Sequence, residues 1–211
     1  SLYQTEQRQA KTTRILVYPN ITFAKDLEKD SYIQVIKKQI TLLNEIRDDL
    51  WFYLILPKEV PSLVFDNVTQ LIVYLPTHSP TMRAHFDTEA IKKVLPREYD
   101  FDLVMCHLPE HAYDLKNVLY NKTQHVPKFF GYAHWFDFKE VVNWPMDSFN
   151  KSMIGLLEYD KCYINTQHQK EMVLKQAEEI FNSDTLYKLS NILQVQHIGV
   201  DGKDIVLDIH E

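Results

Sequence analysis

Short apolar runs that favour β-strands alternate with longer amphipathic segments along most of the chain, and this alternation constrains the fold more than any other feature. Seven such runs occur, at residues 14–18, 51–56, 69–75, 101–107, 128–134, 161–165 and 192–198. Several are apolar at consecutive positions instead of alternate ones, which is typical of parallel strands covered by helices on both faces. We therefore predict an α/β fold: a Rossmann-like, doubly wound and mainly parallel sheet of about seven strands.

Three segments between these runs have the residue pattern of helices that pack on such a sheet. In residues 26–49 the apolar side chains recur at intervals of three and four, which places them on one helical face. These side chains are Ile33, Ile36, Ile40, Leu43 and Ile46. Residues 111–122 can form a helix after the fourth strand, and residues 167–181 a helix after the sixth, with Thr166 as its N-cap. Each strand-helix-strand unit should cross over in the right-handed sense.

Composition and charge exclude several classes of protein. A chain of 211 residues with 45% hydrophobic content can bury a sizeable core. The net charge of −6, with the basic residues spread along the chain, offers no basic face for nucleic acid. No apolar run reaches the ~20 residues of a membrane span. The polar first residues do not resemble a secretory signal, so we expect a cytoplasmic setting, with a peripheral membrane location left open. Cys106 and Cys162, each inside an apolar run, should be small buried hydrophobes.

The sequence contains no standard cofactor-binding or metal-binding motif. The first strand is followed by PNITFAKDLEKD, which has neither a G-x-G-x-x-G pattern nor a P-loop, so we expect no dinucleotide site. The stretch HLPEH, residues 107–111, formally matches the H-x-x-E-H pattern of inverted zinc peptidases, which needs both histidines on one helix. Pro109, however, favours the first turn of a helix, which leaves His107 outside it. We expect neither a metal nor a bound cofactor.

Polar side chains follow the ends of several predicted strands. His78, His107 and His134 each come just after such a strand end, and Glu110 lies in the same loop as His107. The carboxyl ends of parallel strands meet at one edge of a sheet, where α/β proteins bind ligands. Imidazole can donate or accept a hydrogen bond near neutral pH, which suits sugar hydroxyls or phosphate. For His134 the structural alternative is an imidazole packed among aromatic rings.

Three further residues complete the set of candidate substrate-binding positions. Asp137 lies in the aromatic stretch FFGYAHWFDF, and its structural alternative is a helix cap or a turn. Thr166 is also the predicted helix cap, a role compatible with ligand contact because helix N-termini attract anions. Asn20 lies in the PNITF loop after the first strand.

Three motifs, taken in order, resemble the N-terminal domain of the retaining glycosyltransferases of the GT-B fold. KFFGYAHWFDF, residues 128–138, resembles a strand that ends in a histidine followed by aromatic or acidic residues. YDKCYINTQHQKEMVLKQ, residues 159–176, resembles an aspartate, an apolar strand, a small hydroxylic residue and a helix. ILQVQHIGVDGKDI, residues 192–205, resembles the strand that leads to Gly-Val-Asp before the domain crossover, and residues 199–201 are the sharpest match.

This resemblance implies a division of labour between two domains. The N-terminal domain receives the acceptor, a C-terminal domain holds a nucleotide-sugar donor, and the reaction occurs in the cleft between them. His134 would be the catalytic residue that reaches the donor sugar near its reacting carbon. The other candidates would contact a glycan, lipid or protein acceptor: His107, Glu110, Asp137, Thr166, Asn20 and His78. The PNITF loop departs from the glycine-rich loop that this family often has after its first strand.

The same resemblance divides the chain into three parts. Residues 1–13 would be a polar extension, residues 14–200 the Rossmann-like domain, and residues 201–211 the start of the crossover. The donor-binding domain would then come from a longer chain or from a partner chain. Two other functions stay open: a stand-alone α/β module that binds a glycan or a protein without catalysis, and a small hydrolase or isomerase that uses His107 and His134. The second is disfavoured because no Ser or Cys lies in a nucleophile-elbow pattern.

Overall fold

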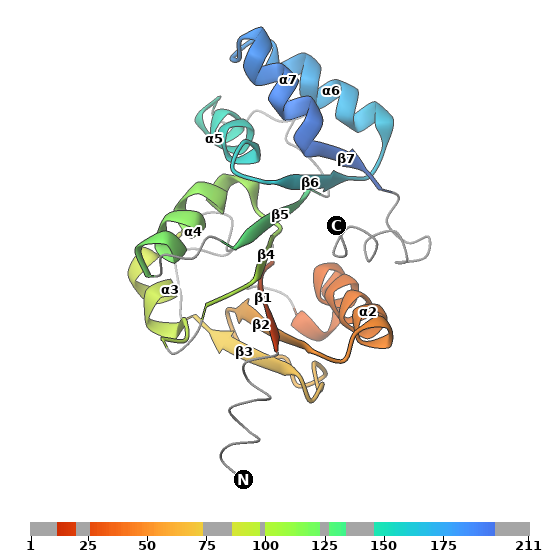
Figure 1. The fold of residues 1–211 in the computed structure, drawn as a ribbon, viewed down its shortest axis with the longest axis vertical. Helices are drawn as coiled ribbons and strands as arrows, with labels where there is room; N and C mark the ends of the chain where they lie inside the picture. The colour runs from red at the N-terminus through yellow and green to blue at the C-terminus, as the bar shows by residue number, and fades with distance from the viewer. Residues whose placement is uncertain are drawn as a thin grey trace.

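The computed structural model describes residues 12–19, 26–73, 86–97, 100–122, 127–133 and 146–196. Within this part of the chain, seven strands form one all-parallel sheet in the order β3-β2-β1-β4-β5-β6-β7 (Figure 1). The strands are β1 (Thr13–Tyr18), β2 (Leu50–Leu56), β3 (Val68–Ile72), β4 (Leu103–Cys106), β5 (Lys128–Ala133), β6 (Lys161–Ile164) and β7 (Leu193–Val195). The predicted Rossmann-like sheet is confirmed.

The strand order reverses its direction between β1 and β4, which makes the pair a topological switch point. Figure 1 shows α2 on one side of these strands and α3 and α4 on the other, as in a doubly wound fold. The helices of the described chain are the 3-10 helix η1 (Leu27–Lys29), α2 (Ser31–Ile46), α3 (Thr88–Val94), α4 (Pro109–Lys122), α5 (Met146–Leu156), α6 (Gln167–Ala177) and α7 (Ser183–Ile192). Of these, α3, α5 and α7 were not predicted from the sequence.

The predicted apolar face of α2 is confirmed except at its last position. Ile33, Ile36, Ile40 and Leu43 are buried, as the spacing predicts. Ile46 is 47% exposed, so its assignment to this face was wrong. It is the last residue of the helix, and the chain leaves in an extended conformation at the next residue, which carries the Ile46 side chain past the edge of the covered surface.

The predicted N-cap of α6 and the predicted place of Pro109 in a first helical turn are confirmed, although α4 begins two residues before the predicted range 111–122. The Thr166 side chain accepts a hydrogen bond from the Gln169 N–H at 3.0 Å and caps α6. The helix ends at Ala177, earlier than predicted, and residues 178–180 form a turn. Pro109 is the first residue of α4, so His107 lies outside this helix.

The core is built from strands that are buried on both faces. Cys106 and Cys162 are both fully buried, which confirms that they pack as small hydrophobes. Burial raises the pKa of the Cys106 thiol to about 12, so the thiol stays protonated at neutral pH.

Among the described residues, no helix combines the length and the apolar character that crossing a membrane requires.

Candidate functional site

The carboxyl edge of the sheet at the β1/β4 switch point is the place where a doubly wound fold binds ligands. His107, the first residue after β4, extends the pairing with β1, because its N–H donates to the Tyr18 carbonyl at 2.8 Å. Its side chain is 2% exposed. The ring stacks on Tyr132 of β5, with centroids 5.6 Å apart, and meets the edge of Tyr32 of α2 at 6.2 Å. His107 is therefore at the predicted edge, packed among aromatic rings on the side of α2.

These rings are part of an aromatic row, formed by Tyr32, His107, Tyr132 and Tyr163. Tyr132 and Tyr163 are neighbours on β5 and β6, with ring centroids 6.3 Å apart. Burial raises the pKa of Tyr132 well above its usual range, so its phenol remains neutral. The row crosses the ends of β4, β5 and β6 at the edge where ligands are expected.

A second histidine lies at the switch point, on the opposite side of the sheet. His111, in the first turns of α4, is 2% exposed, and its Nδ1 is 2.9 Å from the Tyr18 hydroxyl. The Phe86 ring also contacts it, at 5.5 Å between centroids. Burial raises the pKa of Tyr18 well above its usual value, so this hydroxyl keeps its proton and can donate it to Nδ1. In the sequence, His111 stands out only as the last residue of the zinc-peptidase pattern HLPEH.

Glu110 and His107 share a loop region, but the structure directs their side chains to different places. Glu110 lies in the first turn of α4, is 8% exposed, and lines a groove of about 330 Å³ between α4 and α5. His107 instead points toward α2. Successive side chains of a strand point to opposite faces of the sheet, and the chain turns into α4 at Pro109. The side chains of His107 and Glu110 can therefore point in different directions although the residues are only three positions apart.

Thr166 lies at the same edge as His107, two residues after the end of β6, and is exposed. Two strand spacings separate β4 from β6, which is about 10 Å. The two side chains therefore flank β5 without contact. Four predicted residues, Asn20, His78, His134 and Asp137, lie outside the described residues.

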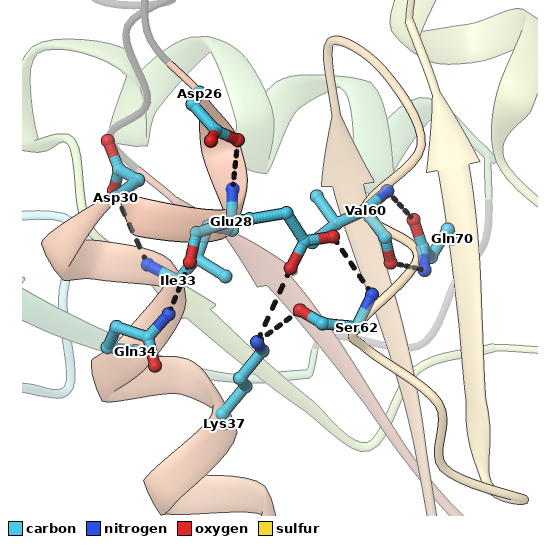
Figure 2. Close-up of polar contacts among 9 residues, drawn as sticks. All are labelled: Asp26, Glu28, Asp30, Ile33, Gln34, Lys37, Val60, Ser62 and Gln70. Carbon is cyan, nitrogen blue, oxygen red and sulfur yellow. Dashed lines mark hydrogen bonds and ion pairs between the residues drawn. The ribbon is translucent and has the colours of Figure 1, made fainter.

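The opposite end of this edge carries a network of polar contacts between α2 and the loop that follows β2 (Figure 2). A Glu28 carboxylate oxygen accepts the Ser62 N–H at 3.0 Å, and the other lies 3.7 Å from the Lys37 ammonium, which also contacts the Ser62 hydroxyl. Gln70 exchanges two hydrogen bonds with the Val60 backbone, at 2.8 and 2.9 Å. The contacts of Ser62 fix the loop against η1 and α2, and those of Val60 fix it against β3.

A serine hydroxyl beside a lysine ammonium is also the pairing used by Ser-Lys hydrolases. In this chain the hydrogen bonds from Ser62, and then Lys37, lower the pKa of the Glu28 carboxyl, so it is negatively charged at neutral pH. The Lys37 ammonium contacts both the Glu28 carboxylate and the Ser62 hydroxyl, so the serine and the lysine are held within the same set of polar contacts. The cluster is therefore a structural clamp. Elsewhere in the described ranges, no three His, Cys, Asp or Glu side chains are grouped so that they could hold a metal ion.

The sheet order and the switch point define a Rossmann-like α/β domain. No model of a known protein family matches the chain, and no curated protein sequence matches it either.

Proposed function

We propose that this domain is the acceptor-side half of a retaining glycosyltransferase, which moves a sugar from a nucleotide diphosphate sugar to a hydroxyl acceptor. The observation that carries the proposal is the arrangement around the end of β5. This strand ends at Ala133, the residue before His134, and its neighbours β4 and β6 end just before His107 and Thr166. The described parts of the three glycosyltransferase-like motifs contain β5, β6 and β7, which are consecutive strands of the sheet, and this supports the proposal.

In this proposal His134 contacts the donor sugar near its reacting carbon. Hydrogen bonding there would stabilise the departing phosphate and the oxocarbenium-like centre. His107 is a positioning residue, because it stacks on Tyr132, two residues before His134, and so holds the end of β5. Thr166 and Asp137 would contact the acceptor. A second domain would supply the nucleotide-sugar donor, and the reaction needs no metal.

The test is the substitution His134→Ala in the full-length gene product. Loss of one stabilising group in the cleft costs about 10²–10³ in turnover, so we expect a decrease of that size at saturating donor, with an unchanged circular dichroism spectrum. His168→Ala is the matched control, since His168 is an exposed histidine on α6. Wild-type turnover in His134→Ala would remove this residue from the mechanism. The 211-residue chain alone should not bind nucleotide sugars in a calorimetric titration.

The alternative is a stand-alone α/β module that binds a glycan or a protein without catalysis. It requires no second domain and no donor. A full-length gene product that binds a glycan but releases no nucleotide from any nucleotide sugar would favour this alternative.

A further inference from the structure

The described sheet ends in two edge strands, β3 at one end of the strand order and β7 at the other (Figure 1). The outer side of an edge strand carries backbone N–H and C=O groups that can pair with another extended chain. Natural proteins usually block such an edge with a very short strand, a lysine, a proline, a bulge or a covering segment. In this sheet only the edge at β7 is blocked in such a way.

The strand β7 is short, and its outward backbone groups are largely occupied. It has only three residues. The Gln196 N–H donates to the Ile164 carbonyl of β6 at 2.7 Å, and because alternate residues of a strand bond to the same neighbour, Leu193 faces outward. The Leu193 N–H donates to the Leu189 carbonyl, and the Lys170 ammonium donates to the Leu193 carbonyl at 3.0 Å. Little of this edge is therefore left for pairing.

The outward backbone groups of β3 are open. This strand pairs with β2 over five consecutive positions, without a bulge. The Asn67 carbonyl and the Val73 N–H both bond to β2, at 2.8 Å. By the same alternation, the backbone groups of Val68, Gln70 and Ile72 face away from β2. Within the described part of the chain, no hydrogen bond reaches the backbone N–H or C=O of Gln70 or Ile72.

The sequence of β3 also lacks the residues that block an edge. Residues 67–75 read NVTQLIVYL, without a charged residue or a proline. β-branched and aromatic residues, which favour strands, are frequent in this run. All five residues of β3 are partly exposed. An uncharged and partly exposed edge strand of this kind is a surface on which another strand can pair.

The strand is complementary to a second copy of itself. In an antiparallel pair centred on Gln70, this residue exchanges both backbone hydrogen bonds with Gln70 of the second copy. The Ile72 N–H of each copy donates to the Val68 carbonyl of the other. Thr69 then lies opposite Leu71 and Val68 opposite Ile72, so every cross-strand pair is uncharged. Such a contact uses the same surface on both copies and closes at two of them.

We propose that β3 pairs antiparallel with β3 of a second copy of this chain, which joins the two sheets across a two-fold axis. Trp51 of β2 adds apolar surface to the contact, because it is partly exposed and its Nε1 donates to the Thr69 hydroxyl at 2.8 Å. The strands of the two copies run in opposite directions, so their carboxyl edges face opposite ends of the joined sheet. Both candidate sites stay open, and the dimer does not depend on the proposed transfer reaction.

The test is the oligomeric state of the 211-residue chain, measured by sedimentation velocity from micromolar to millimolar concentration. We expect an equilibrium between monomer and dimer for the wild type. Thr69→Lys should weaken the dimer about tenfold, because the two lysines lie diagonally across the strand pair, about 7–8 Å apart. Thr69→Val is the matched control. It also removes the acceptor of the Trp51 hydrogen bond but adds no charge, so it should keep the dimer.

A main-chain variant and amide hydrogen exchange locate the contact. Ile72→Pro removes an N–H that faces away from β2, so it should weaken the dimer and leave the monomer folded. The Gln70 and Ile72 amides should exchange more slowly as the protein concentration rises. The Val195 amide, on the edge at β7, should not change. Circular dichroism and thermal melting confirm that each variant folds.

The inference is overturned if the folded wild-type chain stays monomeric at millimolar concentration. It is also overturned if Thr69→Lys and Thr69→Val dimerise equally, or if a dimer forms without slower exchange at Gln70 and Ile72. Slower exchange of these amides only in the presence of a different protein would assign the edge to that partner and reject the second copy. Nucleotide release by the full-length protein is a separate measurement, so failure of the dimer and failure of the transferase are distinguishable.

Discussion

Gly131→Ala should destabilise the domain. This is the opposite of the usual expectation, because a glycine in the middle of a strand normally destabilises the strand relative to alanine. Gly131 lies on β5, in register between Cys106 of β4 and Cys162 of β6. A methyl group there would lie 2.4 Å from the Tyr159 ring. That ring is buried and stacks on Phe129 at 5.5 Å between centroids. Its hydroxyl donates to the Cys106 carbonyl at 3.0 Å, so the ring cannot move aside without losing this hydrogen bond.

The magnitude follows from three contributions. Replacing glycine by alanine in a compatible conformation stabilises a protein by about 0.4–1 kcal/mol, through the unfolded state. Overpacking of a core costs about 1–3 kcal/mol, and loss of the buried hydrogen bond about 0.5–1.5 kcal/mol. The free energy of unfolding should therefore decrease by roughly 0.5–4 kcal/mol, compared with the ~5–15 kcal/mol typical of a domain.

Urea denaturation followed by far-UV circular dichroism measures this change. Tyr159→Leu supplies the second arm of a double-mutant cycle, because it removes both the ring and the hydrogen bond. In the Tyr159→Leu background the alanine methyl has room, and Gly131→Ala should then be neutral or stabilising. The reasoning is refuted if Gly131→Ala alone is as stable as wild type, or if it costs the same in both backgrounds.

Two further substitutions test local interactions. Hydrogen bonds from Arg47 and then Thr13 lower the pKa of the Asp49 carboxyl to about 2. The charged carboxylate therefore stabilises the fold fully above pH ~4, and this stabilisation is lost as the pH falls through about 2. Asp49→Asn should cost about 1–2 kcal/mol at pH 7, after allowance for solvent screening, and should reduce the loss of stability between pH 4 and 2 in urea titrations. An unchanged acid dependence would contradict this assignment. Thr166→Ala should cost about 1 kcal/mol, because the Gln169 N–H loses its acceptor, whereas Thr166→Ser should keep most of that stability. Equal urea midpoints for Thr166→Ala and wild type would argue against the cap.

The strands could be predicted because each one carries its own signal. A run of consecutive apolar residues, as in β2 and β4, indicates a strand that is buried on both faces. The starts of α4 and α6 could also be predicted from local signals, because one residue marks each of them: Pro109 for α4 and Thr166 for α6. α7 could have been found in the same way, since Asn182 caps it and Leu189 and Ile192 are buried at a spacing of three. α3 has only seven residues and a single buried one, which is too weak a pattern.

The candidate site was less predictable because its side chains depend on contacts between distant segments. The position of His107 at a strand end follows from the sequence, but its stacking on Tyr132 depends on the pairing of β4 with β5. The contact between His111 and Tyr18 could not be predicted because the two residues are 93 positions apart in the sequence. The groove that contains Glu110 exists because Gly155 lets α5 approach Pro109, and no local pattern reveals that approach.

The most direct test of the central claim is the release of nucleoside diphosphate by the full-length gene product from a panel of nucleotide sugars. We predict release from one donor, faster when an acceptor is present, and an NMR spectrum of the product that shows the anomeric configuration of the donor. The claim is contradicted if the folded protein releases no nucleotide from any donor, and retention is contradicted if the product has the opposite configuration.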